Sequence, residues 1–538
     1  MSETLDKYGR KAEYMMNSYA QDWEKSKLTP VEDYCFLSDP EASETFIIEF
    51  SGKVRLYYEN DTPVLPGLRQ KADTPYLFKF EPGVRCWKNG FLPVLQIYRN
   101  EHCQEELFAS GKKLYRCTRG KYFVYPEEEE VTRDIYEKKR CCVEKYWHNF
   151  FAKLDEIPDL GSWAENGWKS SFVQSFSAFW GRHTKYGVEE YGCMRHDGFP
   201  PTVLAAAGAL AEFGNVSEAR ALVLRYFDRF LRADGSIRYY GTALSEYGGL
   251  LRLCSQLSKG EDGEAFFAAC SRNLLLFCRL MRDLLDCVMN PPSSSYALLA
   301  GSPEADLRER KDEYFHNNGA VLRGLEELLL LLEQYNVRPD LYEVQDLYDQ
   351  LKRRFDFAVA DMSKRFSFLP YRTANAGEIY DFTADLDWAF ANYRYYPELL
   401  ESGLLAPEDA KRIITGRFER KGMFLGLTAL NYPAQFLLCF DHWPHISLGR
   451  GLLEYGETGY FHQILEAHAS LYMCQDLFTC YESELPGTPM KAYTDWCVPA
   501  QLVFPRLLKM CTGFTRRDGS RLTPGIPEGL KNSKTDLV

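Results

Sequence analysis

The chain has 538 residues, of which 45% are apolar and 26% are charged, and this composition argues against a disordered or fibrous protein. Its formal net charge of −12 argues against a nucleic-acid-binding protein, because nucleic-acid-binding surfaces are usually basic. No apolar run reaches the roughly 18 residues that a membrane-spanning helix needs, so we expect no membrane partner.

Sixteen cysteines are spread along the chain, and none belongs to a CxxC pair. Several of them, such as Cys254, Cys270 and Cys278, lie in apolar helical patterns. The N-terminal stretch lacks the apolar segment of a secretory signal. We therefore expect reduced thiols in a cytoplasmic protein, and a disulfide framework is the less favoured alternative.

Strand-like patterns mark the N-terminal part of the chain. Thr45–Phe50 and Lys53–Tyr58 flank the dipeptide Ser51-Gly52, which is a two-residue turn signal. Similar strand patterns continue to about residue 126. The sequence therefore predicts a small antiparallel, β-sandwich-like domain over residues 1–127.

A run of four glutamates, Glu127–Glu130, follows these strands. Negative charge stabilises the N-terminal end of a helix, so the run predicts the start of a linker helix over residues 128–160. An acidic docking patch is the alternative interpretation.

The remainder of the chain shows one amphipathic helical pattern after another. After the capping residue Asn215, apolar residues recur at spacings of three and four until Asp234-Gly235 ends the segment. By the same criteria we predict twelve helices, at about 164–181, 200–213, 216–232, 244–258, 263–288, 316–335, 339–361, 382–396, 406–418, 442–456, 459–480 and 495–512.

Twelve consecutive helices suggest six hairpins closed in a ring. We therefore predict a mainly α fold, with an (α/α)6 barrel over residues 161–515 and a C-terminal tail over 516–538. An open α-solenoid is the alternative, but solenoids show a fixed sequence repeat and this chain has none. Function usually lies in long loops at one end of such a scaffold.

Two long loops carry the best candidates for acid–base chemistry. The loop after the fifth helix holds five carboxylates, one of which could be a general acid: Glu304, Asp306, Glu309, Asp312 and Glu313. The loop after the eleventh helix holds Glu482 and Glu484, followed by Pro486-Gly487. A six-hairpin ring brings both loops to the same end, and glycosidic bond cleavage needs two carboxyl groups.

Two further loops carry candidates for sugar binding. Arg195 and Asp197 can hold sugar hydroxyls by charge-assisted hydrogen bonds, with a structural ion pair at a helix start as the alternative. Glu246, followed by Tyr247 and two glycines, is either a carboxylate facing a cleft or a helix-capping residue.

In this arrangement the chain resembles the six-hairpin glycosidases, which include glucoamylase-like, trehalase-like and rhamnosidase-like hydrolases and disaccharide phosphorylases. Arg195-His196-Asp197 is similar to the arginine/aspartate element that grips the terminal sugar in the glucoamylase-like members. Asp312-Glu313-Tyr314 is similar to the DEY stretch of the phosphorylases, whose glutamate is the general acid. Aligned to glucoamylases instead, the acid falls nearer Glu304 or Glu309.

Glu482, four residues before Pro486, is similar to the E-x-x-x-P-x-G element that holds the base of the inverting hydrolases. Phosphorylases lack this base, because phosphate is their nucleophile. The resemblance therefore implies an inverting, exo-acting hydrolase of small oligosaccharides or glycosides inside the cell, with Glu313 as acid, Glu482 as base, and Glu304 and Glu484 as alternatives. It implies a carbohydrate substrate held by Arg195, Asp197, Glu246, Tyr247, His316, Trp443 and Trp496.

Three other interpretations stay open. A disaccharide phosphorylase would need inorganic phosphate, and a non-catalytic helical scaffold would bind carbohydrate or protein without turnover. His442 and His445 suggest a metal pair, but a zinc site needs further ligands at defined spacing, and we find none. We therefore expect neither a metal nor a cofactor.

Overall fold

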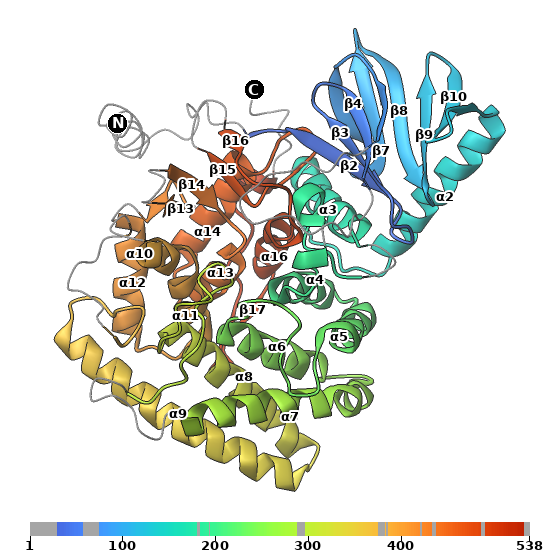
Figure 1. Cartoon of the computed structure of the whole chain (residues 1–538). Coiled ribbons are helices and arrows are strands. Elements are labelled where there is room, and N and C mark those ends of the chain that lie inside the picture. Colours follow the sequence, from blue (N-terminus) through green and yellow to red (C-terminus); the bar gives the residue numbers. More distant parts are fainter. Residues whose placement is uncertain are drawn as a thin grey trace.

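The structure is a computed structural model, and it describes residues 30–57, 75–179, 183–192, 194–287, 296–374, 382, 386–419, 422–432, 437–485 and 490–531. The described chain is mainly helical with small, largely antiparallel sheets, which confirms the predicted mainly α class. Two of the sheets stand beside a larger helical body (Figure 1). The fifteen cysteines among these residues are free thiols. None of the described helices has the length and apolar character needed to cross a membrane.

Two antiparallel sheets precede the helices. The first contains β2 (Tyr34–Ser38), β3 (Thr45–Glu49), β4 (Lys53–Tyr57) and β5 (Tyr76–Lys79) in that spatial order. The second contains β6 (Val84–Lys88), β7 (Leu92–Arg99), β8 (His102–Ser110), β9 (Lys113–Thr118), β10 (Lys121–Tyr125) and β11 (Glu129–Glu130). Ile48 of the first sheet and Leu95 of the second are fully buried in one common core.

The glutamate run does not begin the linker helix. Glu129 and Glu130 pair with Val124 and Phe123 as the edge strand β11. The helix α2 (Arg133–Phe151) begins only after Thr132, whose side-chain oxygen accepts a hydrogen bond from the Ile135 backbone N–H. A capping threonine therefore sets the start of the helix, and the preceding charges lie exposed on the sheet edge.

The helical body follows in chain order. It consists of α3 (Ser162–Ser177), α4 (Pro200–Glu212), α5 (Val216–Phe230), α6 (Leu244–Leu257), α7 (Gly263–Cys287), α8 (Phe315–Gln334), α9 (Arg338–Arg365), α10 (Leu386–Phe390), α11 (Tyr396–Ser402), α12 (Pro407–Glu419), α13 (His445–Glu454), α14 (Thr458–Ala467), α15 (Val498–Gln501) and α16 (Val503–Met510). Single π-helical turns follow α10 at Ala391–Tyr395 and α14 at His468–Tyr472.

Six of these helices pack in a cycle: α4 on α6, α6 on α8, α8 on α11, α11 on α13, α13 on α16, and α16 on α4. Glycines allow the closest of these approaches. A Cβ atom on Gly248 of α6 would lie 2.3 Å from the carbonyl carbon of Ala320, and one on Gly324 of α8 would lie 2.5 Å from the Gly248 oxygen. No larger residue fits where two backbones come this close.

The six helices line a cavity of about 120 Å³. Glu246, Arg394 and Trp443 line it near the N-terminal ends of their helices, and Arg252 and Arg450 line it further along α6 and α13. The loops that precede the six helices therefore lie at the Glu246 end of this cavity.

A third sheet was not predicted, because the sequence pattern after residue 160 indicated helices alone. It contains β12 (Met423–Phe424), β13 (Leu427–Tyr432), β14 (Leu437–Asp441), β15 (Ser483–Leu485) and β16 (Met490–Ala492), with β1 (Pro30–Val31) parallel to β16 at its edge. Asp441 pairs with Ser483 across β14 and β15, so Asp441 comes beside Glu482.

The chain after residue 513 forms a hairpin and a last short helix. The elements are β17 (Phe514–Thr515), β18 (Arg521–Leu522) and α17 (Glu528–Lys531). Leu530 is buried, and its carbonyl oxygen accepts a 2.9 Å hydrogen bond from the Gly161 backbone N–H. The end of the described chain is thus attached to the start of the helical body.

Candidate functional site

Glu482 is held by two tyrosines from the loop that precedes α4. The hydroxyl of Tyr186 donates to Oε1 of Glu482, and the hydroxyl of Tyr191 donates to Oε2. The Glu482 backbone is also fixed, since its carbonyl oxygen accepts a 2.6 Å hydrogen bond from the Tyr472 hydroxyl. A carboxylate fixed by two donors, with its side chain only half-buried, is oriented without being closed off from solvent.

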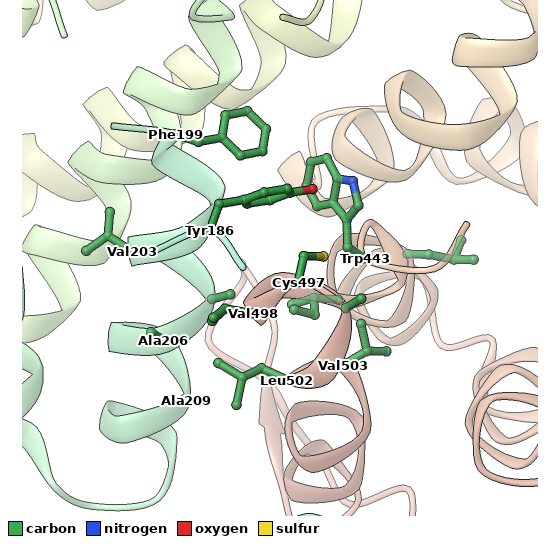
Figure 2. Close-up of a cluster of buried hydrophobic side chains, with 14 of the residues drawn as sticks. Tyr186, Phe199, Val203, Ala206, Ala209, Trp443, Cys497, Val498, Leu502 and Val503 are labelled. Atoms are coloured by element: carbon green, nitrogen blue, oxygen red, sulfur yellow. The ribbon is translucent and has the colours of Figure 1, made fainter. Parts of the chain in front are cut away.

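Aromatic rings surround this carboxylate. Figure 2 shows Tyr186 beside Phe199 and Trp443, above the small aliphatic side chains of α4. The Phe199 ring makes edge contacts with Tyr186 at 5.3 Å and with Trp443 at 6.0 Å between centroids. These three rings are buried, so they form an aromatic wall behind the Tyr186 hydroxyl and lower the local polarity on the Tyr186 side of Glu482.

Burial and neighbouring negative charge raise the pKa of Glu482 to about 7, against hydrogen bonds from the two tyrosines that lower it. The Asp306 carboxylate adds to the increase. Asp441 is buried beside Glu482, and the loss of water raises the pKa of Asp441 well above its ordinary value. Its Oδ1 atom is buried and has no hydrogen-bond partner among the described residues.

Glu304 and Asp306 form the second acidic element. Glu304 is 5% exposed, and its Oε1 atom accepts a hydrogen bond from the Asp306 backbone N–H. Burial, and then the Asp306 charge, raise the pKa of Glu304 to about 8. The Asp306 side chain reaches solvent, but the protein atoms packed around its carboxyl reduce its hydration, and this raises the pKa of Asp306 as well. The two carboxyls therefore titrate as a coupled pair with a proton available near neutral pH.

One arginine holds the floor of the site. Arg394 is fully buried in the π-helical turn, and its guanidinium contacts three carboxylates: Glu246 at 2.8 Å, Glu304 at 3.0 Å and Glu398 at 2.6 Å. The same guanidinium lies 5.1 Å from the centroid of the Trp443 ring. One positive charge cannot fully compensate three buried carboxylates, which explains why Glu246 and Glu304 keep raised pKa values.

We expect the substitution Arg394→Leu to destabilise the protein by about 3–5 kcal/mol, because it leaves buried carboxylates without their counter-charge. Urea unfolding followed by circular dichroism measures this loss. Arg365→Gln is the matched control, because Arg365 forms an ion pair with Asp361 in which both side chains are exposed (56% and 39%), and such pairs contribute about 0–1 kcal/mol.

The destabilisation should depend on pH. Burial raises the folded-state pKa of Glu246 and Glu304, so the unfolded chain releases protons at lower pH than the folded chain. The free energy of unfolding therefore falls as pH rises from about 5 to about 8. In Arg394→Leu this slope should be steeper, and a pH-independent deficit would contradict the counter-charge role.

Glu313, the first choice for the acid from the sequence, is engaged in holding a loop. Its Oε1 accepts from the Leu298 backbone N–H at 3.0 Å, and its Oε2 accepts from Tyr296 N–H at 3.2 Å and from the Thr373 hydroxyl at 2.7 Å. Three donors fix this carboxylate in position, whereas the Asp306 side chain is exposed, and Glu313 as the acid stays a prediction.

Four other predicted site residues are buried, and three of them have structural contacts. Trp496 is fully buried and donates from Nε1 to Gln501 at 2.7 Å. His316 is fully buried, stacked on Tyr395 at 4.4 Å, and burial lowers its pKa to about 3. The Tyr247 hydroxyl accepts from the Ile237 backbone N–H at 3.2 Å. Glu484 is buried, and its oxygens have no partner among the described residues.

Of the predicted arginine/aspartate element, only one member is open to solvent. Asp197 is buried and forms an ion pair with Lys185 at 2.8 Å. Arg195 is exposed beside Asp306, whose pKa its charge lowers. Glu246 caps α6, since its side chain accepts a hydrogen bond from the Ala243 backbone N–H. The same carboxylate also lines the cavity and pairs with Arg394. Pro486-Gly487 lie outside the described residues.

Four residues of the site were not predicted from the sequence: Tyr186, Tyr191, Asp441 and Arg394. The two tyrosines lie in the same loop as Arg195 and Asp197, and the aromatic residues of that loop are the signal that could have indicated them. Asp441 lies one residue before the predicted helix 442–456, at the end of the strand β14, which was not predicted. Arg394 lies within another predicted helix, and nothing in its local pattern marks it.

The two histidines considered as metal ligands belong to a buried aromatic cluster. The rings of His442 and His445 lie 3.9 Å apart, and Nδ1 of His442 lies 3.2 Å from Nδ1 of His468. Burial lowers the pKa of all three histidines. In the parts of the chain that the structure describes, no three potential ligand side chains are grouped as a metal site.

No protein-family model and no curated protein sequence matches the chain. Among solved structures it is similar to a bacterial glucoamylase complexed with acarbose (10% identity, 89% of this chain and 85% of that chain, TM-score 0.48). It is also similar to a glycosidase variant in complex with glucose (12% identity, 65% of this chain and 96% of that chain, TM-score 0.41). A third similar structure is an unsaturated glucuronyl hydrolase specific for heparin (12% identity, 64% of this chain and 96% of that chain, TM-score 0.38). These neighbours are glycosidases. At these identities and TM-scores the similarity assigns no catalytic role to any residue of this chain.

Proposed function

We propose that the protein is a glycoside hydrolase whose site lies at one end of an (α/α)6 barrel. The observation that carries the proposal is the pair of acidic elements: Glu482, oriented by two tyrosines, and Glu304 with Asp306, which interact with it electrostatically. The cyclic packing of six helices supports the barrel. An acid–base pair beside aromatic rings is what hydrolysis of a glycosidic bond requires.

The proposed reaction is a single displacement with inversion. Asp306, the exposed member of its pair, donates its proton to the glycosidic oxygen as the bond to the anomeric carbon breaks. Glu482 removes a proton from the water molecule that attacks the opposite face of that carbon. The two carboxyls should then lie about 6.5–9.5 Å apart, which leaves room for the water. Trp443, Glu246 and Arg394 line the cavity enclosed by the six helices, and a cavity at this end of the helices supports exo-action on the terminal sugar of a small glycoside.

The pH profile of kcat/KM follows from these carboxyls. Glu482 must be ionised to act as a base, and its pKa is about 7, so activity should rise as pH increases through 7. The Glu304–Asp306 pair must keep its proton, and the pKa of Glu304 is about 8, so activity should fall above 8. We expect a bell-shaped profile with its maximum between these values. A profile flat between pH 6 and 9 would contradict the assignment.

The test of the function is turnover of a panel of α- and β-linked nitrophenyl glycosides and disaccharides. Proton NMR of the first product released should show the anomeric configuration opposite to that of the substrate. Release of a sugar phosphate that requires inorganic phosphate would instead indicate a phosphorylase. Retention of configuration would contradict the single displacement, and absence of turnover across the panel would favour a non-catalytic scaffold.

A further inference from the structure

Two guanidinium groups lie against one tyrosine ring beside the acidic pair. The Cζ atom of Arg195 is 4.8 Å from the centroid of the Tyr240 ring, and that of Arg308 is 5.0 Å from the same centroid. Arg195 comes from the loop before α4 and Arg308 from the loop before α8, so two distant parts of the chain meet here. Stacking on an aromatic ring orients a guanidinium while leaving its N–H donors free to bind in the plane of the group.

The position of this ring is fixed by the fold. Tyr240 stacks on Tyr239 at 4.7 Å, and Tyr239 contacts Phe199 in the aromatic wall at 5.1 Å. The next residue, Gly241, has a φ of +68°, and a Cβ there would lie 2.7 Å from both the Ala305 oxygen and the Arg308 Cβ. The loop carrying Tyr240 therefore packs tightly on the loop carrying Arg308 and Asp306.

The two stacked arginines differ from their basic neighbours in how their charge is compensated. Arg310 and Arg372 are paired with Asp387, at 2.7 Å and 3.7 Å. In the described part of the chain, Arg195 has no carboxylate within 4.0 Å, and Arg308 has only Glu309 at 3.4 Å, whose side chain is 91% exposed. Asp306 is the remaining acidic neighbour, close enough for both arginines to lower its pKa.

Two stacked arginines, with the exposed Glu309 and Asp306 as their acidic neighbours, place local positive charge in a protein whose net charge is −12. A site lined by Asp306, Glu304 and Glu482 repels an anion unless local positive charge opposes it. Oriented guanidiniums bind carboxylate or sulfate groups through paired, charge-assisted hydrogen bonds. Exposed arginines held at the edge of an acidic site thus provide what a negatively charged sugar requires.

We propose that the substrate carries an anionic substituent, a carboxylate or a sulfate, which Arg195 and Arg308 bind beside the scissile bond. This inference rests on the proposed function, because it names the class of glycoside that the same site accepts. It assigns to the two arginines a role in substrate specificity.

The test compares matched pairs of nitrophenyl glycosides that differ only in the charged group: glucuronides against glucosides, galacturonides against galactosides, and 6-sulfated against unmodified glucosides. We expect kcat/KM of the wild-type protein to be at least about tenfold higher for an anionic member. The uronide and sulfate arms identify which anion is preferred.

Arg195→Gln and Arg308→Gln should each lower the ratio of kcat/KM for the anionic member to kcat/KM for its neutral partner about tenfold, mainly through KM of the anionic member. The ratio is the readout because both arginines also act on the pKa of Asp306, and that effect is common to the two members of a pair. Lys311→Gln is the matched control, because it removes one exposed positive charge from the same loop without removing a stacked guanidinium. Equal preference for neutral and anionic members, or equal losses in Lys311→Gln, would overturn the proposal.

Binding measurements separate this inference from the proposed function. Isothermal titration calorimetry with glucuronate, glucose 6-sulfate and glucose needs no turnover. Tighter binding of an anion than of glucose, lost in Arg195→Gln, supports the inference even if no glycoside is hydrolysed. Turnover of neutral glycosides together with equal binding of glucose and the anions would leave the hydrolase intact and refute the anionic substrate.

Discussion

Replacing Glu482 by glutamine is expected to lower kcat by about three orders of magnitude or more for every glycoside that the protein hydrolyses. Glutamine keeps the size of the side chain but cannot take a proton from water. The loss should not depend on the leaving group, because the base acts on the nucleophile. Steady-state kinetics with nitrophenyl and alkyl glycosides measures this effect.

Glu484→Gln is the matched control for that experiment. Glu484 lies in β15, which begins directly after Glu482, and burial raises its pKa well above the ordinary value, which favours the uncharged form. A glutamine is close in shape and charge to a protonated glutamate, and activity should be unchanged. If instead Glu484→Gln abolished activity and Glu482→Gln did not, the base would be Glu484.

The tyrosines that hold Glu482 add a finer test. In Tyr186→Phe or Tyr191→Phe one donor to the carboxylate is lost, and each hydrogen bond lowers the pKa of Glu482. The acidic limb of the pH profile should therefore move to higher pH in either variant. A purely structural role for these tyrosines would lower kcat without moving that limb.

The second large effect is expected from Asp306→Asn. A general acid matters most when the leaving group is a poor one, so kcat should fall about 10²–10⁴-fold for alkyl glycosides. With dinitrophenyl glycosides, whose leaving groups need no proton, the loss should be much smaller. A plot of log kcat against leaving-group pKa becomes steep in the variant and is the measurement to make.

Two companion variants make this result decisive. Glu304→Gln should lower activity through the same pair, and the basic limb of the pH profile should shift, because Glu304 and Asp306 titrate together. Glu309→Gln should have no effect, because that side chain is 91% exposed. Loss of activity in Glu309→Gln alone would move the acid to Glu309, and loss in a Glu313→Gln variant that remains stably folded would restore the original assignment.

Helix patterns were predictable because they depend on near neighbours in the chain. The segment capped by Asn215 was expected to begin a helix near 216, and α5 begins at Val216 with the Asn215 side chain accepting from the Glu218 N–H. The strands β12–β16 were not predictable in the same way, because they are two to six residues long and the sheet depends on the pairing of β14 with β15, which are distant in sequence. Short apolar runs of this kind do not distinguish a strand from a helix.

The candidate site was likewise predictable only where local sequence was sufficient. Residue types and loop positions were enough to select Glu482 and the acidic loop after α7, because two carboxyls at one end of a helical ring are a chemical requirement that can be recognised locally. The sequence did not show which carboxylate of that loop is the acid. Glu313 and Asp306 have similar sequence surroundings, and only the structure shows that Glu313 holds a loop while Asp306 faces solvent.

From the order of its residues alone, this chain determined a mainly α fold and the starts of most helices. Only the folded chain brought Tyr186 to Glu482, Arg195 and Arg308 to one tyrosine ring, and Glu246, Glu304 and Glu398 to Arg394. The reason is physical: burial and charge proximity, which set pKa values and orientation, arise between residues up to about three hundred positions apart, and no local pattern records them.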